Sequence, residues 1–242
     1  MRTAADIEKA LAEVGTAARA AGTKRYLKSS MRHLGASVPQ MRAEAKGAAK
    51  EVGTRRELRA LADDLWAEPV FERRACAAFL LDYRVELLGP ADIATIKRYV
   101  ASSGTWALVD PLSADLLGDL LLARPEAAVR LEPWARDRDF WVRRAALLSQ
   151  IKPLKAGADF GRFAGWADAM LDEREFFVRK AIGWVLREVG KTRPAEVYDW
   201  LLPRATRASG VTTREAVKYL EPAQREAIVA RGGRGTTSRA IS

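Results

Sequence analysis

The sequence predicts an all-α protein built from stacked pairs of helices. Alternating β-branched patterns are rare, whereas Ala, Leu, Arg and Glu recur at helical spacing between Gly and Pro breaks. The chain also contains an internal repeat, because five similar blocks start at Phe71, Trp106, Trp141, Phe177 and Thr212, at intervals of 35, 35, 36 and 35 residues. A helix pair that recurs at such a period is typical of a helical solenoid.

Each repeat is predicted to hold one helix that starts near its block and a second helix that follows a Gly or Pro break. The blocks read FERRACAAFL, WALVDPLSAD, WVRRAALLSQ, FVRKAIGWVL and TTREAVKYLE. The second helices are expected in PADIATIKRYV (90–100), PEAAVRLEPWA (125–135) and DFGRFAGWADAML (159–171). We expect one domain over residues 1–228 and a flexible basic tail over residues 229–242, where Gly and Arg are frequent.

Two of the repeats resemble the core of a HEAT repeat. RDRDFWVRRAA and DEREFFVRKAI both place an acidic residue before hydrophobic residues, Val-Arg and Ala. The tetratricopeptide pattern of small and aromatic residues is absent, as is the ankyrin Thr-Pro-Leu-His signature. Stacked HEAT-like pairs form a solenoid with a concave face, which suits an extended partner. The fold class expected is therefore an all-α, HEAT-like helical-repeat solenoid with a concave basic groove.

Charge and rare residues limit the classes of function. The 242 residues include 41 Lys and Arg against 31 Asp and Glu, a net charge of +10, so nucleic acid is the expected partner. One cysteine, Cys76, and one histidine, His33, exclude a disulfide framework and a His/Cys zinc site and disfavour a His-dependent triad. Both are interpreted as structural residues, and no metal or cofactor is expected. Without a signal peptide or a membrane span, we expect a cytoplasmic monomer with no membrane partner.

One position departs from the repeat pattern. The fifth residue of each block is alanine in four repeats and a carboxylate in one, as the series Ala75, Asp110, Ala145, Ala181 and Ala216 shows. Trp106 precedes Asp110 by one helical turn, and Trp184 follows Lys180 by one turn. If the repeats stack in register, these residues and Arg144 converge on one strip of the groove.

Each of these residues also has a structural interpretation. Asp110-Pro111 is typical of a helix start, with Asp as the N-cap and Pro in the first turn. Trp106 and Trp184 could belong to the core, and Arg144 could be a structural arginine of the repeat, as Arg143 is interpreted to be. Only their coincidence in three adjacent repeats favours a functional site.

Several segments resemble the AlkD-type DNA alkylpurine glycosylases, a bacterial family of HEAT-like solenoids that remove N3- and N7-alkylated purines. The similar segments are YLKSSMRHLGASVP from Tyr26, LADDLWAEPVFERRACAAFLL, TWALVD, FWVRRAALLSQ and EFFVRKAIGWVLREVGKTRP. They occur in the family's order and span roughly residues 20 to 225. The resemblance implies a monofunctional glycosylase that acts on double-stranded DNA in base excision repair and associates with the nucleoid when bound to DNA.

The resemblance also implies roles for individual residues. Asp110 would be the essential carboxylate, with Trp106 and Trp184 as the aromatic walls beside the nucleoside. Arg144 would contact the DNA backbone, and Tyr26 would be a further groove residue. Lys180 and Arg179, which precede the second tryptophan, are predicted from their charge to bind phosphates. Pro111 departs from the family pattern and could shift Asp110.

Two questions stay open at the level of sequence. The substrate could be a small adduct such as 7-methylguanine or 3-methyladenine, or a bulky adduct of an alkylating natural product in a self-resistance role. The Ala- and Arg-rich composition suggests a GC-rich genome, in which antibiotic producers are common. The alternative function is a catalytically silent HEAT-repeat scaffold that binds DNA or protein, although a scaffold does not require a carboxylate between two tryptophans.

Overall fold

A computed structural model describes residues 2–238 of the chain, and side chains as far as residue 233. The chain divides into two compact units, unit 1 (Met1–Arg130) and unit 2 (Leu131–Ser242), and each is treated by itself. The all-α prediction is confirmed. Between residues 2 and 238 no strand occurs, although Arg32 and Val70 form an isolated β-bridge. The single domain expected over residues 1–228 stays a prediction.

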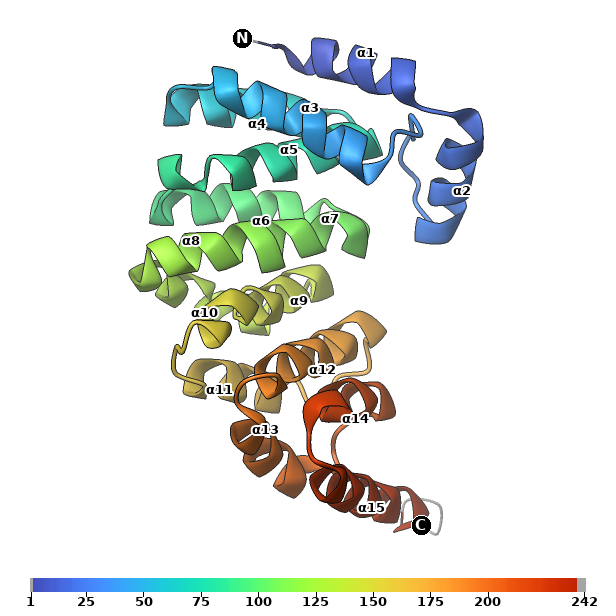
Figure 1. The fold of residues 1–242 in the computed structure, drawn as a ribbon, viewed down its shortest axis with the longest axis vertical. Coiled ribbons are helices and arrows are strands. Elements are labelled where there is room, and N and C mark those ends of the chain that lie inside the picture. The colour runs from blue at the N-terminus through green and yellow to red at the C-terminus, as the bar shows by residue number, and fades with distance from the viewer. Residues whose placement is uncertain (1, 239–242) are drawn as a thin grey trace. The chain divides into compact units, whose positions relative to one another are not determined.

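Unit 1 consists of antiparallel helices that lie on one another (Figure 1). Helix α5 is central, since α3 and α4 pack against it from one side and η3 from the other. The elements are α1 (Ala4–Val14), α2 (Ala17–Leu27), α3 (Val38–Glu51), α4 (Arg55–Ala67), α5 (Phe71–Tyr83), η1 (Val85–Leu87), η2 (Pro90–Asp92), α6 (Ile93–Ala101), α7 (Trp106–Asp110), η3 (Pro111–Leu117) and α8 (Gly118–Ala123).

Unit 2 is organised around α12, which packs against α9, α13 and α14. The 3₁₀ helix η4 (Pro125–Arg136) contains the division between the units. The elements that follow are α9 (Phe140–Leu148), α10 (Ile151–Lys155), α11 (Gly161–Ala169), α12 (Phe176–Gly190), α13 (Pro194–Leu201), η5 (Leu202–Arg204), α14 (Gly210–Ala216), η6 (Val217–Tyr219) and α15 (Pro222–Ser238).

The predicted repeat is confirmed, because every block begins a helix. The five helices start at Phe71, Trp106, Phe140, Phe176 and Gly210, within two residues of the expected positions. A polar residue directly before four of these helices accepts a hydrogen bond from a backbone N–H of the first turn. The acidic residue of the HEAT-like pattern is therefore the N-cap: Asp139 accepts from the Trp141 N–H at 2.7 Å, and Glu175 accepts from the Phe177 N–H at 3.4 Å.

Residues 125–135 form the second helix expected in this repeat, and this helix is of the 3₁₀ type and not an α-helix. Pro133 lies inside this segment, and proline both lacks an N–H and clashes with the carbonyl four residues earlier, which opposes α-helical hydrogen bonding. The tail predicted from residue 229 is helical as far as Ser238, because α15 continues through it, and residues 239–242 lie outside the described part.

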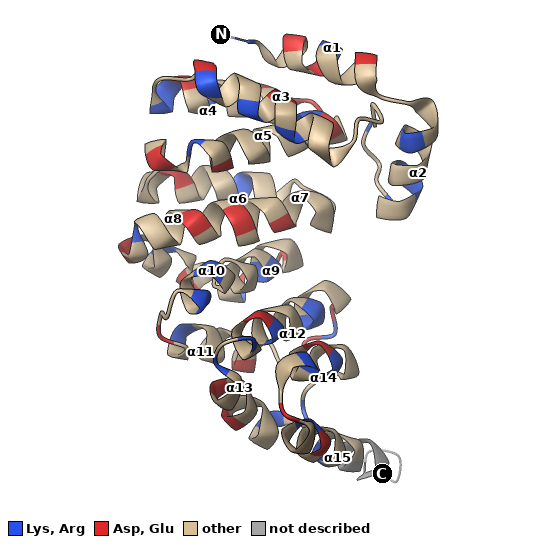
Figure 2. Ribbon diagram, viewed as in Figure 1, with Lys and Arg blue, Asp and Glu red and all other residues tan. Residues whose placement is uncertain are grey.

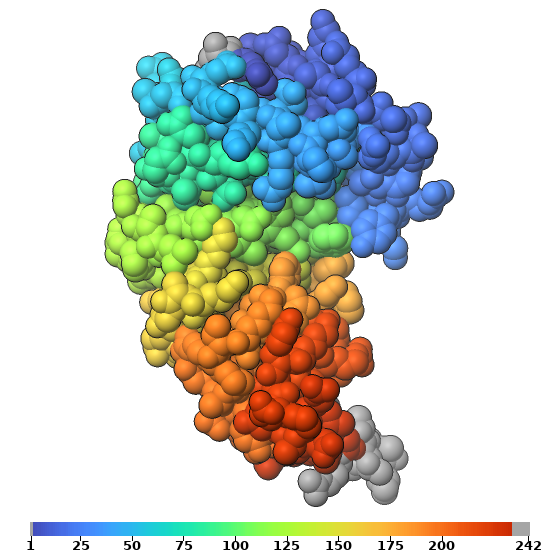
Figure 3. All heavy atoms as spheres, in the orientation of Figure 1, coloured from blue at the N-terminus to red at the C-terminus, as the bar shows by residue number. Residues whose placement is uncertain are grey.

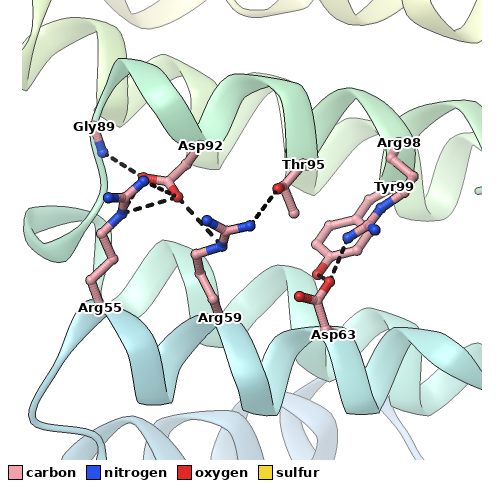
Figure 4. Close-up of polar contacts among 8 residues, drawn as sticks. All are labelled: Arg55, Arg59, Asp63, Gly89, Asp92, Thr95, Arg98 and Tyr99. Atoms are coloured by element: carbon pink, nitrogen blue, oxygen red, sulfur yellow. Dashed lines mark hydrogen bonds and ion pairs between the residues drawn. The ribbon is translucent and has the colours of Figure 1, made fainter.

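Polar contacts join α4 to α6 across the surface of unit 1 (Figure 4). The buried Asp92 carboxylate accepts hydrogen bonds from Arg55 Nε at 3.0 and 3.2 Å and from Arg55 Nη2 at 3.0 Å. Further along the two helices, Asp63 accepts from Tyr99 Oη and from Arg98 Nη2, both at 2.5 Å. Burial and the Asp63 carboxylate raise the pKa of Tyr99, so its hydroxyl stays a donor. These contacts fix the two helices in register.

The rare residues lie in structural positions, as the sequence interpretation expected. Cys76 is completely buried in α5, and its Sγ lies 3.4 Å from the Met41 carbonyl. Burial raises the pKa of this thiol. The His33 ring stacks on Phe71 with centroids 4.9 Å apart. Within the described residues, no helix has the length and apolar character needed to cross a membrane.

Candidate active site

Asp110 lies at the end of the first stretch of a helix and not at its start. Helix α7 begins at Trp106, and the side chain of Thr105 caps it by accepting a hydrogen bond from the Ala107 N–H at 3.4 Å. Asp110 has the backbone angles of a right-handed helix, φ −65° and ψ −48°, whereas an N-cap residue has extended angles. The alternative that Asp110 merely caps a helix is therefore wrong.

Pro111 changes the type of helix without ending it. A proline has no N–H to donate to the carbonyl four residues back, so the α-helical pattern is interrupted there. The chain continues as the π-helix η3, and the Ser113 hydroxyl donates to the carbonyls of Val109 at 2.7 Å and Asp110 at 3.3 Å. Asp110 thus lies at the junction of an α-helical and a π-helical segment, and π-helical turns are frequent at functional sites.

Three predicted site residues belong to unit 1 and are called the aspartate cluster: Tyr26, Trp106 and Asp110. Trp106 and Asp110 are four residues apart in one helix, so their side chains share a face, and both are half-buried. Tyr26 belongs to α2, and its ring meets that of Trp106 edge-on, with centroids 6.0 Å apart. The structure therefore places Tyr26 beside Trp106, although the two are far apart in sequence.

The position of α2 depends on a close crossing of two backbone segments. Gly35 has φ +85°, and a Cβ there would collide with the Thr16 carbonyl, so only glycine fits. The Thr16 N–H donates to the Gly35 carbonyl at 3.1 Å. The buried Glu72 carboxylate accepts from the N–H groups of Leu34 at 2.9 Å and Gly35 at 2.8 Å. Glu72 therefore fixes the loop that holds α2, and with it Tyr26.

Glu72→Gln is expected to loosen α2. The amide of glutamine offers one oxygen, and its NH₂ group cannot accept from the second N–H, so one backbone donor loses its partner at a cost of about 1–3 kcal/mol. Amide hydrogen exchange should speed up in residues 17–36 and stay slow in α5. Glu13→Gln, on the exposed face of α1, is the control and should leave the exchange of both segments unchanged. Unchanged exchange in α2 of Glu72→Gln would refute this role.

In unit 2 the structure brings Arg144 and Trp184 together. The Arg144 side chain is buried, with 2% of the residue exposed, and its Nη1 donates to the Phe177 carbonyl at 2.7 Å. The guanidinium carbon lies 5.9 Å from the ring centroids of both Phe177 and Trp184. Such contacts between a cation and aromatic faces are attractive. Arg144 thus has a structural role within unit 2, and its contact with DNA stays a prediction.

Arg143 and Arg179 occupy the same position in successive repeats and make the same kind of contact. Arg143 Nη1 donates to the Asp137 carbonyl at 2.7 Å, and Arg179 Nε donates to the Glu173 carbonyl, in each case six residues earlier. Arg143 also pairs with the Glu173 carboxylate at 2.7 Å. Burial raises the pKa of Glu173, but its contacts, led by the Arg143 charge, together lower it by more, so the pKa lies below its usual value. This geometry supports the interpretation of Arg143 as a structural residue. For Arg179 it favours a structural role over the predicted phosphate contact.

Lys180 is exposed near the start of α12, next to an aromatic group that the sequence interpretation missed. Its Nζ lies 6.0 Å from the ring centroid of Phe176, which is 52% exposed. Phe140, Trp141 and Phe177 continue the group, with successive ring centroids 4.5 to 5.4 Å apart. The sequence feature that indicates this aromatic group is the pair of aromatic residues after each acidic N-cap, Phe-Trp in one repeat and Phe-Phe in the next.

The predicted site residues therefore fall into the aspartate cluster of unit 1 and a second group in unit 2, which consists of Arg144, Arg179, Lys180 and Trp184. Convergence of the two groups on one strip stays a prediction. Among the residues that the structure describes, no three His, Cys, Asp or Glu side chains are grouped so that they could hold a metal ion. The aspartate cluster offers one carboxylate, an indole and a phenol, which suits stabilisation of a cation.

The sequence matches a known protein family over most of its length. The family is described as "DNA alkylation repair enzyme", and the match covers residues 7–220. Among proteins whose function has been curated, none matches this sequence. The match includes every predicted site residue.

Solved structures with the same fold are known. The chain is 24% identical to a predicted DNA alkylation repair enzyme from Enterococcus faecalis, with a TM-score of 0.78, and the alignment covers 86% of this chain and 97% of that one. AlkD2 from Streptococcus mutans is 16% identical, with a TM-score of 0.62 and coverage of 90% and 97%. The protein smu.31 from Streptococcus mutans UA159 is 17% identical, with a TM-score of 0.56 and coverage of 74% and 92%. These similarities establish the fold.

Proposed function

Because the chain belongs to the family of DNA alkylation repair enzymes, we propose that it is a monofunctional DNA glycosylase. It hydrolyses the N-glycosidic bond of N7- or N3-alkylated purines in duplex DNA. The observation that carries this proposal is the position of Asp110. Its half-buried carboxylate lies inside a helix, one turn from Trp106, at a position where the other four repeats have a buried alanine.

The chemistry of the substrate matches this arrangement. An N7- or N3-alkylated purine already carries a positive charge, so its glycosidic bond breaks without protonation of the base by a general acid. The base leaves with the bonding electrons as a neutral purine, the sugar becomes an oxocarbenium ion, and water then adds to C1′ and releases a proton. The negative charge of Asp110 stabilises the developing cation. At about 4 Å and an effective dielectric constant of about 20, this attraction is worth roughly 4 kcal/mol.

The proposal also gives roles to the two tryptophans and to the cations. Indole faces stabilise a nearby cation by about 0.5–2 kcal/mol and exclude water from it. Trp106 is held edge-on against Tyr26, and Trp184 lies beside the Arg144 guanidinium, so both rings are positioned by neighbours. Lys180 is exposed, and its proposed role is to bind a phosphate, a contact that supplies affinity and register but no reading of sequence.

Trp184→Ala is expected to slow excision about tenfold, since loss of about 1.4 kcal/mol of cation stabilisation corresponds to one decade. Trp184 also contacts the Arg144 guanidinium, so the change could disturb the arginine. Trp184→Phe is the matched variant, because it keeps an aromatic face there and should retain most of the rate. The rate of release of the alkylated base under single-turnover conditions is measured for wild type and both variants. Melting curves of both variants are recorded alongside. Equal rates for wild type and Trp184→Ala would remove Trp184 from the site.

Incubation with alkylated duplex DNA followed by alkali tests the proposal. A monofunctional glycosylase leaves an abasic site, so strand breaks should appear only after alkali treatment. Breaks without alkali would indicate a lyase, and intact DNA with both methylated and bulky adducts would favour the scaffold alternative. Comparison of N7-methylguanine, N3-methyladenine and a bulky natural-product adduct in the same duplex shows which lesions are substrates and whether a self-resistance role is supported.

A further inference from the structure

A cavity lies between η4 and α11 in unit 2. Its volume is about 610 Å³, and its lining residues fall within 132–136 and 161–169, all of them in unit 2. Sites for small molecules in proteins have volumes of about 300–1,000 Å³. None of the described residues that line the cavity belongs to the predicted site. The cavity is therefore large enough for a small molecule and shares no residue with the candidate active site.

Helix α11 is open to solvent on one face. Within this helix, all of which the structure describes, only Phe163, Trp166 and Ala167 are buried. The residues directly before it, 155–159, are exposed. In Figure 3 yellow atoms from this part of the chain lie at the surface of unit 2. A ligand can therefore reach the cavity from the exposed face of α11.

The cavity offers a ligand an apolar wall. Trp166 is buried, with 7% of the residue exposed, and it lines the cavity together with Pro133. The indole N–H of Trp166 donates to Glu132 Oε2 at 2.8 Å, so the protein itself satisfies this donor. The part of the indole that remains for a ligand is its hydrocarbon surface, and aromatic rings pack favourably against one another.

Gly165 leaves the helix backbone open to a ligand. It lies in the middle of α11, is exposed and lines the cavity. A Cβ at this position would have no neighbouring atom within 4 Å beyond the adjacent backbone, and φ is not positive. Neither packing nor backbone conformation therefore requires glycine here, although glycine destabilises a helix relative to alanine. Close approach of a ligand to the backbone explains such a residue.

The charges at the cavity leave an excess of positive charge. Arg162 Nε donates to Glu132 Oε1 at 3.0 Å, and this arginine belongs to the blue segment near the start of α11 in Figure 2. Arg136 is exposed and forms no ion pair among the residues whose side chains are described. Two guanidinium groups thus share one carboxylate, and the charge of Arg136 is available to an anion.

We propose that this cavity binds a planar aromatic ligand that carries an anionic group such as a carboxylate. The ring packs against Trp166 and the open backbone at Gly165, and the Arg136 guanidinium binds the anionic group. The planar fork of arginine matches the two oxygens of a carboxylate. This site is independent of the glycosylase function, because it uses none of the residues that the function requires.

The experiment follows the amide chemical shifts of the full chain by NMR, with naphthoate as the probe. Saturable shifts are expected for the amides within residues 132–136 and 161–169. Naphthamide has the same rings without the charge, and it should bind about tenfold more weakly, since a charge-assisted hydrogen bond is lost. Absence of these shifts, shifts centred on the exposed Phe176 instead, or equal affinities for the two probes would overturn the proposal.

Gly165→Leu separates binding from folding. Leucine fills the open part of the cavity and is a better helix former than glycine, so the variant should melt at the wild-type temperature or higher and lose naphthoate binding. Arg136→Gln should weaken naphthoate binding about tenfold and leave naphthamide binding unchanged. Arg138→Gln is the matched control and should bind naphthoate as the wild type does, because Arg138 is exposed but does not line the cavity. Wild-type affinity in Gly165→Leu, or equal losses in the two arginine variants, would refute the site.

Discussion

Asp110→Asn is expected to slow excision of 7-methylguanine by about three decades. The substitution keeps the shape of the side chain but removes the charge, and roughly 4 kcal/mol of attraction to the sugar cation corresponds to that loss of rate. DNA affinity should change little, because the carboxylate acts on a cation that develops during the reaction. The measurement is single-turnover release of the base at saturating enzyme, with melting curves recorded alongside.

Asp115→Asn serves as the matched control. Asp115 lies in the same helical run, is also half-buried, and pairs with Arg42 at 3.7 Å. The Asp115→Asn variant should excise 7-methylguanine at the wild-type rate. Equal rates for Asp110→Asn and wild type would exclude Asp110 from the mechanism. A slow Asp110→Asn variant with an unchanged melting temperature would distinguish loss of chemistry from loss of fold.

Gly183→Ala should lower the melting temperature and destabilise unit 2 by about 1–3 kcal/mol, the usual cost of overpacking. A Cβ at Gly183 in α12 would lie 2.8 Å from the Thr212 carbonyl oxygen and 2.8 Å from the Glu215 Cβ, so α14 would have to move. The obstacle includes backbone, which yields less readily than the end of a flexible side chain. Thermal unfolding followed by circular dichroism measures the effect.

Gly165→Ala is the matched control for this prediction. Gly165 lies in α11 of the same unit, is exposed, and has open space within 4 Å of the point that a Cβ would occupy. Alanine favours a helix over glycine by up to about 1 kcal/mol, so this variant should melt at a higher temperature than wild type. Opposite shifts for the two variants are expected. A rise in melting temperature for Gly183→Ala would mean that α12 and α14 are less closely packed than the structure shows.

The repeat architecture could be predicted because its signals are local. Each block lies at the start of a helix, and in four of five cases the residue directly before that helix caps it, so period and helix start are both encoded within a few residues. The group around Arg144 and Trp184 also follows from register, since residues one repeat apart become neighbours in a stack. The Trp106 and Asp110 pair follows from helical spacing alone.

The remaining features of the fold and of the candidate site depend on contacts between segments distant in sequence or on backbone hydrogen bonding. Local sequence patterns do not reveal either. Glu72 contacts N–H groups 37 and 38 residues earlier, and no local motif marks such a carboxylate. The position of Tyr26 against Trp106 depends on the glycine crossing that this carboxylate holds. The structural role of Arg179 could have been found from its alignment with Arg143. The sequence does not show that Pro111 leads to a π-helix instead of a break, because that outcome depends on contacts such as the one from the Ser113 hydroxyl to the Val109 carbonyl.

The burial of Cys76 has a practical consequence for labelling. The chain has one cysteine, and its buried thiol with a raised pKa resists thiol-directed reagents. The natural protein therefore serves as an unreactive background, and a cysteine placed at an exposed position becomes the single site of attachment. Tyr26→Cys would carry a fluorophore, or a disulfide tether to a thiol-modified nucleotide, next to Trp106. Cross-linking yield along a series of modified duplexes would then map the path of the nucleic acid across unit 1.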